Sequence, residues 1–337
     1  MTQVEILRQD AQEACTESMP DAPLEGPIVW SRNGLAPSDG VLAIDAPVEK
    51  EVAELMRFLR TNPLPLVLLE ASDFDLPACR ALMTRARDSL EQGVGFAIID
   101  RLPLDDMTVA EASALFWVLA QMVARPVAQS WDGKMTYDVR DTGAKPGYGV
   151  RPDVTNAEQN FHTDNSYNLF PPDYVALLCI RPALSGGINS IVSFYTVYNE
   201  MRRRHRELLA RLHHPFLFDR QLEHAEGDPP VLSHSLFEYI EGRLVCRLSR
   251  HQVLNGCKLA GVKLDSEGEA AIECLEAIMA EPAWNREFNF ERGQIQIVDN
   301  IRCGHRRTQF IDYPEPERKR HLLRLWLRNR GRRFYNG

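Results

Sequence analysis

The later part of this chain shows short strand patterns separated by turns, and this alternation limits the folds that the chain can adopt. Residues 174–180 are apolar without interruption, as expected of a strand that is covered on both faces. Further strand candidates are residues 191–194, 232–240, 243–248, 288–290 and 295–298. Helical patterns intervene at residues 197–212 and from Ser266, where Glu269 would complete a capping box. Strands with helices packed outside them predict an antiparallel barrel or a double-sheet jelly roll.

The first part of the chain is mainly helical by pattern. Residues 47–60 place apolar side chains at helical spacing, and a second helix of this kind follows Pro77. Thr108 and Glu111 form a capping box at the start of a third. Before these helices, prolines and glycines up to about residue 40 permit only a short helical pattern near the N-terminus.

One strand interrupts these helices. Residues 95–100 form a short apolar run bounded by glycine and proline, which is typical of a buried strand. We therefore expect a helical N-terminal region at residues 1–94, packed on a core that spans residues 95–337 and contains helical insertions.

Composition excludes several classes of protein. The chain has 39 basic and 47 acidic residues, a net charge of −8, which argues against a nucleic-acid partner. Seven scattered cysteines without a CxxC pair indicate reduced thiols rather than a disulfide framework. The polar N-terminus and the absence of a run of about 18 apolar residues predict a cytoplasmic protein without a membrane partner. The oligomeric state is not indicated.

The stretch around His162 and Asp164 carries the first chemical signal. Alternate residues of a strand project to one face, so the imidazole and the carboxylate would point together, with Thr163 facing outward. They could be two ligands of a metal site. In an arbitrary chain such a pair is more often a hydrogen-bonded surface pair, so the surroundings decide.

His305 is the candidate for a third ligand. It follows a strand pattern and a turn, which would place its imidazole at the mouth of a barrel, although a surface loop is the alternative. Two histidines and one carboxylate form the facial triad of non-heme Fe(II) oxygenases, with positions left open for a cosubstrate and dioxygen. The same number of ligands also describes a catalytic zinc site.

The strand pattern at residues 320–328 has two different faces. At a period of two, Arg320, Arg324 and Trp326 share one face, and the other face is mainly leucine and is expected to pack in the core. Guanidinium groups bind carboxylates through two hydrogen bonds. These arginines therefore indicate a dicarboxylate cosubstrate and an anionic substrate.

Four motifs occur in the order and spacing of one enzyme family. They are His162-Thr163-Asp164, Gly186-Gly187, Asp299-Asn300-Ile301-Arg302 followed by Gly304-His305-Arg306, and the segment from Arg320 to Trp326. This set resembles the taurine dioxygenase (TauD/TfdA) family, which includes clavaminate-synthase-like enzymes, and the similarity runs from about residue 95 to 327. The resemblance implies an Fe(II)/2-oxoglutarate-dependent dioxygenase on a double-stranded β-helix.

The resemblance also implies roles for single residues. His162, Asp164 and His305 would hold the iron, and Arg320 would bind the distal carboxylate of 2-oxoglutarate. Arg324 would lie near the substrate or assist Arg320. The retained aspartate argues against a halogenase, in which glycine or alanine replaces it.

One position departs from the family pattern. Relatives use a threonine or serine hydroxyl shortly after the Gly-Gly turn to contact 2-oxoglutarate, whereas this chain has Ile188-Asn189-Ser190. Either the Asn189 amide or the Ser190 hydroxyl would have to serve, and the sequence does not choose between them.

The implied reaction is hydroxylation of an unactivated C–H bond in a small carboxylate or amino-acid-like molecule, free or tethered to a carrier protein. It would be coupled to O2 consumption and to decarboxylation of 2-oxoglutarate to succinate and CO2. Desaturation, epoxidation and cyclisation stay open, because they depend on how the substrate is held. Two alternative functions from other classes are a zinc hydrolase and a non-catalytic barrel module.

Candidates for substrate contact surround the metal motif. They are Tyr137, Arg140, Tyr167, Asn168, Arg247 and Arg250, in addition to Arg324. Each could instead be structural, but a set so rich in arginine fits a substrate that carries a carboxylate.

Overall fold

The structure, a computed structural model, describes residues 19–145 and 150–336. The short helical pattern expected near the N-terminus falls largely on residues outside this description. Within it, no helix is long and apolar enough to cross a bilayer. The cysteines in these ranges carry free thiols.

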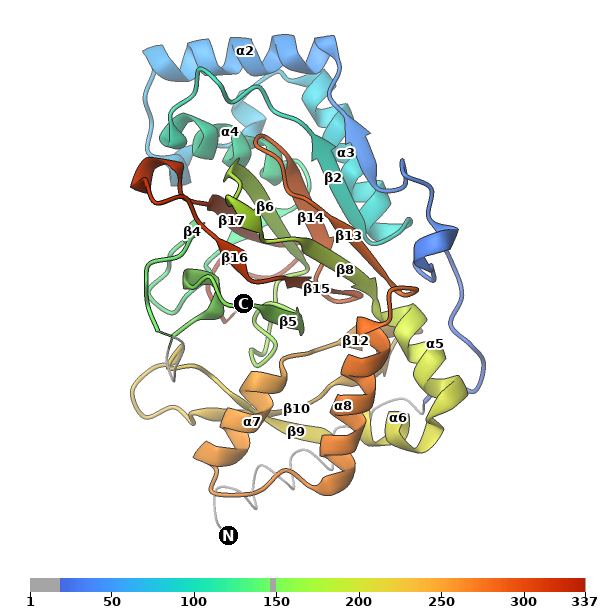
Figure 1. Ribbon diagram of the computed structural model, residues 1–337. Coiled ribbons are helices and arrows are strands. Elements are labelled where there is room, and N and C mark those ends of the chain that lie inside the picture. The colour runs from blue at the N-terminus through green and yellow to red at the C-terminus, as the bar shows by residue number, and fades with distance from the viewer. Residues whose placement is uncertain (1–18, 146–149, 337) are drawn as a thin grey trace.

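Two sheets form the core (Figure 1). The larger, seven-stranded sheet runs in the order β1 (Val41–Ala43), β2 (Phe96–Asp100), β14 (Ile295–Asp299), β6 (Tyr174–Arg181), β17 (His321–Arg328) and β3 (Arg125–Val127), with β4 (Tyr137–Val139) also paired to β17. The smaller, four-stranded sheet runs in the order β13 (Asn285–Phe288), β8 (Asn189–Ser193), β15 (Cys303–Arg307) and β5 (Gln159–His162). Neighbours pair antiparallel except β1 and β2. The expected double-sheet jelly roll is confirmed, and the sheets do not close into a barrel.

The two faces of β17 separate the core into layers, as its period of two predicts. Leu323, Leu325 and Leu327 pack with the helices that cover the outer face of the large sheet. Leu322 and Trp326 point the other way, into separate clusters on the inner face. Burial of such side chains contributes roughly 1.5–3 kcal/mol each. Strand β17 is therefore fixed in orientation, and with it Arg320, just before the strand, and Arg324 within it.

Helices of the N-terminal region cover the outer face of the large sheet (Figure 1). They are α2 (Ala46–Thr61) and α3 (Pro77–Glu91), and α4 (Val109–Gln121), which lies outside residues 1–94, packs beside them. The capping box at Thr108 is confirmed, since its hydroxyl accepts from the backbone of Glu111 and the Glu111 carboxylate accepts from the backbone of Thr108. Because β1 pairs with β2, this region also adds a strand to the core sheet.

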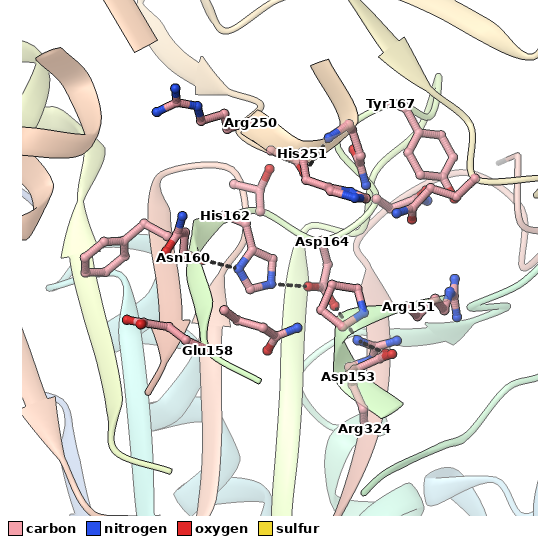
Figure 2. A pocket seen from close by; sticks show the side chains of 18 of the residues that line it. Arg151, Asp153, Glu158, Asn160, His162, Asp164, Tyr167, Arg250, His251 and Arg324 are labelled. Atoms are coloured by element: carbon pink, nitrogen blue, oxygen red, sulfur yellow. Dashed lines mark hydrogen bonds and ion pairs between the residues drawn. The ribbon is translucent and has the colours of Figure 1, made fainter. Parts of the chain in front are cut away.

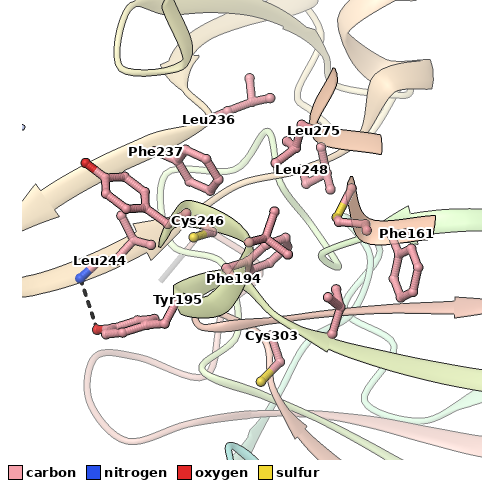
Figure 3. Close-up of a cluster of buried hydrophobic side chains, with 14 of the residues drawn as sticks. Phe161, Phe194, Tyr195, Leu236, Phe237, Leu244, Cys246, Leu248, Leu275 and Cys303 are labelled. Carbon is pink, nitrogen blue, oxygen red and sulfur yellow. Dashed lines mark hydrogen bonds between the residues drawn. The ribbon is translucent and has the colours of Figure 1, made fainter. Parts of the chain in front are cut away.

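An insertion between β8 and β13 covers one end of the small sheet (Figure 1). It contains α5 (Phe194–Arg204), α6 (Arg206–Leu212), β9 (Pro215–Asp219), β10 (Val231–Ser235), β11 (Phe237–Ile240), β12 (Arg243–Cys246), α7 (Arg250–Leu259) and α8 (Ser266–Ala280). Figure 3 shows an apolar cluster that the insertion shares with the core: the rings of Phe194 on α5 and Phe237 on β11 lie 6.3 Å apart edge to face, and Cys303 of β15 belongs to the same cluster. The Phe194 ring also lies against Gly304 of β15, so this packing holds the start of the insertion on the small sheet.

Short elements complete the fold. They are β7 (Ser185–Gly186) paired with β16 (Phe310–Ile311), and the 3-10 helices η1 (Arg32–Gly34), η2 (Leu66–Leu68), η3 (Ala71–Asp73), η4 (Pro152–Val154) and η5 (Pro316–Arg318).

Several element boundaries differ from the sequence expectation. The helix expected at 197–212 begins earlier and is divided at His205, where α5 ends and α6 starts. Helix α8 is capped by Asp265, whose carboxylate accepts from the backbone of Gly268, so the capping box expected at Ser266 is wrong. The strand expected at 232–240 is two strands, β10 and β11. Helix α7 and strand β9 were not expected.

Candidate metal centre and its two cavities

Two histidines face each other across neighbouring strands of the small sheet. The register of β5 and β15 pairs His162 with His305, and the centres of their rings lie 4.4 Å apart. His305 was expected beyond a turn at a barrel mouth, but it lies inside β15, because the turn occurs earlier, at residues 300–302. Strand pairing alone therefore brings together two imidazoles that are far apart in sequence.

Asp164 lies in the turn after β5, so the expectation that it shares a strand with His162 is wrong. Thr163 is also buried, with 3% of its surface exposed, rather than outward-facing. The physical reason is that the backbone of Leu248 pairs with it: the Thr163 N–H donates to the Leu248 carbonyl, and the Leu248 N–H donates to the Thr163 hydroxyl. Asn300 holds the Asp164 peptide from both sides, at 2.7 and 3.0 Å.

The two carboxylate oxygens of Asp164 have different environments. Oδ2 accepts a hydrogen bond from Nε1 of Trp326 at 2.7 Å and lies 3.1 Å from Nη1 of Arg324. Oδ1 lies 3.4 Å from Nε2 of His162 and 3.4 Å from Nε2 of His305. Oδ1 is thus the oxygen directed toward the histidines.

The arrangement fits a metal ion. Ligand atoms of His162, Asp164 and His305 all lie within 4.8 Å of one another. Nδ1 of His162 contacts the Asn160 carbonyl at 2.8 Å, which favours the tautomer with a proton on Nδ1 and a lone pair on Nε2 (Figure 2). Two imidazoles and one carboxylate are the donor set of non-heme Fe(II) sites.

The local electrostatics favour ligand-competent forms of these groups. Burial opposes ionisation of Asp164, but the Arg324 charge and the adjacent imidazoles outweigh it and hold the pKa of Asp164 well below its usual range. Burial and the neighbouring His162 lower the pKa of His305. An ionised carboxylate and a neutral imidazole are the forms that bind a metal.

A cavity of about 40 Å³ between the two sheets connects this centre with Arg320. The Arg320 side chain is 4% exposed, and its Nη1 has no hydrogen-bond partner among the described residues. Burial lowers the pKa of Arg320 to about 10, so the group stays charged at neutral pH. A buried unpaired cation is costly unless an anion joins it, and a carboxylate of 2-oxoglutarate would fit this cavity wall.

Asn189 lines the same cavity, on β8. The neighbouring Ser190 does not line it, and its hydroxyl accepts from Nε of Arg306 at 3.1 Å. Arg307, which the sequence analysis missed, also lines the cavity, and its Nε has no partner among the described residues. Burial and the charge of Arg320 lower the pKa of Arg307 to about 9.

A larger cavity of about 270 Å³ opens beside the metal centre (Figure 2). His162, Asp164 and Tyr167 form part of its wall, and the start of α7 forms the opposite part. Tyr167 is the one substrate candidate besides Arg324 and Arg250 that lines it, and its hydroxyl is hydrogen-bonded to that of Tyr335.

The remaining substrate candidates are held in other ways. Asn168 donates to the Tyr335 carbonyl, and Arg247 donates to the carbonyls of Ser166 and Asn168. Tyr137 lies under the guanidinium group of Arg324. Arg140 is exposed. The structure brings none of these four into the lining of either cavity.

Arg324 is more tightly bound than its sequence position indicated. Its Nη1 lies 3.0 Å from Oδ2 of Asp153 and 3.1 Å from Oδ2 of Asp164, and its Nε donates to Gln129. Asp153, on η4, lines both cavities and was missed by the sequence analysis, because a lone aspartate after a glycine- and proline-rich loop carries no pattern. The role of Trp326 was also missed, although its place on the strand face of Arg324 could have indicated it.

The sequence matches one protein family model. Residues 60–326 match the family described as "Taurine catabolism dioxygenase TauD, TfdA family". Among curated proteins, FR-33289 synthase of Streptomyces rubellomurinus is 28% identical over 319 residues, which cover 93% of this chain and 92% of that protein. The taurine hydroxylase-like protein SAT17 of Stachybotrys chartarum is 24% identical over 169 residues, 49% of this chain and 41% of that protein.

Solved structures share the fold. Asparagine oxygenase in complex with Fe(II), 2S,3S-3-hydroxyasparagine and succinate has a TM-score of 0.65 at 16% identity, over 86% of this chain and 94% of that one. The non-heme iron oxygenase OrfP in complex with Fe and alpha-ketoglutaric acid has a TM-score of 0.64 at 15% identity, with the same coverage.

Proposed function

Since this chain belongs to the taurine catabolism dioxygenase TauD, TfdA family, whose members depend on Fe(II) and 2-oxoglutarate, we propose that it hydroxylates an unactivated C–H bond of a small amino-acid-like molecule. One cavity, which the metal ligands share with a buried arginine, supports this proposal most strongly. His162, Asp164 and His305 line it together with Arg320, whose Nη1 lacks a partner in the described structure. A cation that lines one cavity with three metal ligands fits a dicarboxylate that also reaches the metal.

Each residue has a separate task. Nε2 of His162, Oδ1 of Asp164 and Nε2 of His305 would hold Fe(II), which with 2-oxoglutarate and O2 supplies the oxidising power and releases succinate and CO2. Trp326 and Arg324 bind the other oxygen of Asp164 and so keep Oδ1 directed at the histidines. Arg320 would bind the distal carboxylate of 2-oxoglutarate.

Asn189 is the better candidate for the second contact with 2-oxoglutarate. It lines the cavity with Arg320, whereas the Ser190 hydroxyl is already bound by Arg306. This would replace the hydroxyl that relatives supply at this position with an amide.

The size of the larger cavity and the relatives support a small substrate. A cavity of about 270 Å³ accommodates a molecule of amino-acid size. Structural relatives include an asparagine oxygenase bound to hydroxyasparagine and an oxygenase bound to (3S)-hydroxy-L-Arg. The proposal includes a substrate that is free or tethered to a carrier protein, and a cytoplasmic location.

The test of the metal site is spectroscopic. Under anaerobic conditions, Fe(II) and 2-oxoglutarate added to the protein should produce a weak visible charge-transfer band. His305→Ala should abolish this band, and substitution of an exposed histidine, His214→Ala, should leave it unchanged. A wild-type protein without the band, or an undiminished band in His305→Ala, contradicts the assignment.

The test of the reaction is a product mass. A panel of amino acids and small carboxylates is screened for compounds that increase succinate release. The molecular mass of the product formed from each such compound is then measured by mass spectrometry. Hydroxylation adds one oxygen atom. A product that has lost two hydrogen atoms would contradict hydroxylation and indicate desaturation or ring closure.

A further inference from the structure

The arginines around the larger cavity are already neutralised. Arg151 lies 3.2 Å from Glu223, and Arg324 bridges Asp153 and Asp164. Arg250 pairs with two glutamates of α8, Glu273 and Glu276, and Figure 2 shows its side chain turned away from His162 and Asp164. A cation that is held by carboxylates of its own chain has little to offer an anionic ligand.

Acceptor groups in the same wall are, by contrast, unsatisfied. Oδ1 of Asp153 has no hydrogen-bond partner in the described structure, although the residue is only 5% exposed. The amide oxygen of Gln252, a residue that is 7% exposed on α7, also lacks a partner there. Glu158 adds an exposed carboxylate at the same cavity. Buried acceptors without a donor are rare, because each costs about 1–3 kcal/mol, so a donor is expected from the ligand.

We infer that the larger cavity selects a substrate with a positively charged nitrogen group, an ammonium or a guanidinium, which donates a hydrogen bond to Oδ1 of Asp153. This inference rests on the proposed function, since it names the substrate class of the same site. It reverses the expectation of an anionic substrate, which counted the arginines without their partners. Glu158 supplies the complementary charge at the cavity, and Asp153, whose other oxygen pairs with Arg324, supplies the unpaired acceptor.

The position of Asp153 adds a consequence for the product. One nitrogen of Arg324 contacts both Asp153 and Asp164, at 3.0 and 3.1 Å, so the proposed anchor lies beside a proposed metal ligand. Asp153 lines both the small cavity and the large one. A molecule held at Asp153 therefore presents the carbons near its charged nitrogen to the reacting centre, and hydroxylation is expected on that part of the molecule.

The experiment compares matched ligands. Probes are L-lysine and L-arginine, their uncharged counterparts Nε-acetyl-L-lysine and L-citrulline, and L-glutamate as the acidic member. Binding to protein loaded with Mn(II) and N-oxalylglycine, a 2-oxoglutarate analogue that does not react, is measured by calorimetry. We expect at least one cationic probe to bind about 10-fold or more tightly than its uncharged counterpart and than L-glutamate, as a charged hydrogen bond at a buried site implies.

The variant Asp153→Asn keeps the shape of the side chain and removes its charge, so it should abolish that preference. The control Asp228→Asn removes a carboxylate that pairs with Arg220 on the insertion, and it should retain the preference. Equal or tighter binding of the uncharged or acidic probes, no binding of either cation, or an unchanged preference in Asp153→Asn each overturns the inference.

Failure of the inference and failure of the proposed function are distinguishable. The Fe(II) and 2-oxoglutarate band is recorded for the same protein preparations. A normal band without a preference for cations contradicts only the substrate class, whereas a missing band in the wild type contradicts the proposed function. If Asp153→Asn fails to fold or to form the band, the discrimination by the wild-type protein decides the question.

Discussion

Trp326 donates a hydrogen bond from its indole Nε1 to Oδ2 of Asp164, over 2.7 Å. Both residues are buried, Trp326 at 2% and Asp164 at 6% exposure. The contact joins β17 of the large sheet to the turn after β5 of the small one. It therefore couples the packing of the two sheets to the direction of a proposed metal ligand.

Trp326→Phe should weaken Fe(II) binding without destroying the fold. Phenylalanine retains an aromatic ring in the core but removes the donor to Asp164, and loss of such an outer partner typically costs about 10- to 100-fold in metal affinity. Anaerobic Fe(II) titration, followed by the charge-transfer band, measures the change. Trp284→Phe removes an indole donor to Glu281, outside both cavities, and should have no effect. Equal Fe(II) affinity in Trp326→Phe and the wild type would contradict the proposed orienting role.

Arg320→Ala should raise the 2-oxoglutarate requirement. A carboxylate bound in that cavity would lose the charged partner proposed for it, at a cost of about 2–5 kcal/mol, which is a rise in KM of about 30-fold or more. The KM for 2-oxoglutarate and the KM for the organic substrate are measured together. A rise in the second value alone would assign Arg320 to the substrate instead. Arg220→Ala, which removes a buried arginine paired with Asp228, is the matched control.

Stability should fall between pH 6.5 and 4, partly because of His234. Burial, and to a smaller extent the charge of Arg247, lower the pKa of His234 to about 3. The unfolded chain takes up a proton near pH 6.5 and the folded chain does not, so the stabilisation present above that pH is lost as the pH falls toward 3. One such group lowers the free energy of unfolding by up to about 1.4 kcal/mol for each unit that the pH falls within this range.

His234→Gln tests this assignment, because glutamine keeps a donor for the Tyr167 carbonyl that His234 contacts at 2.9 Å. Urea denaturation of the variant should show a shallower loss of unfolding free energy between pH 6.5 and 4. The exposed His214, substituted in the same way, should leave the slope as in the wild type. Identical slopes for His234→Gln and the wild type would show that this histidine does not set the pH dependence.

Gly256→Ala should destabilise the protein although alanine favours helices. A Cβ at position 256 of α7 would overlap the carbonyl oxygen of Leu217 on β9. The gain in helix propensity, about 1 kcal/mol, is smaller than the expected cost of moving a packed strand, and we expect a net loss of about 1–3 kcal/mol. Thermal or urea unfolding measures it. Leu254→Ala, on the exposed face of the same helix, should change stability little, and a more stable Gly256→Ala would refute the close contact.

The sequence by itself determined the elements whose signal is local. The apolar run that became β6 is covered on both faces, and the two faces of β17 separated as a period of two requires. The capping box at Thr108 needs only four neighbouring residues. The two histidines and the aspartate were metal-ligand candidates from their local pattern, and the family resemblance, whose motifs are short and keep their spacing, implied that they hold iron.

Only the tertiary structure decided how those side chains are used. Asn189 rather than Ser190 lines the cavity, because Arg306 from a neighbouring strand occupies the serine hydroxyl. Arg324 is shared by two aspartates, and the unpaired oxygen belongs to Asp153, which no sequence pattern marked. A count of arginines cannot reveal this, since the charge that a pocket offers depends on which carboxylates, remote in the sequence, the fold has already placed beside each one.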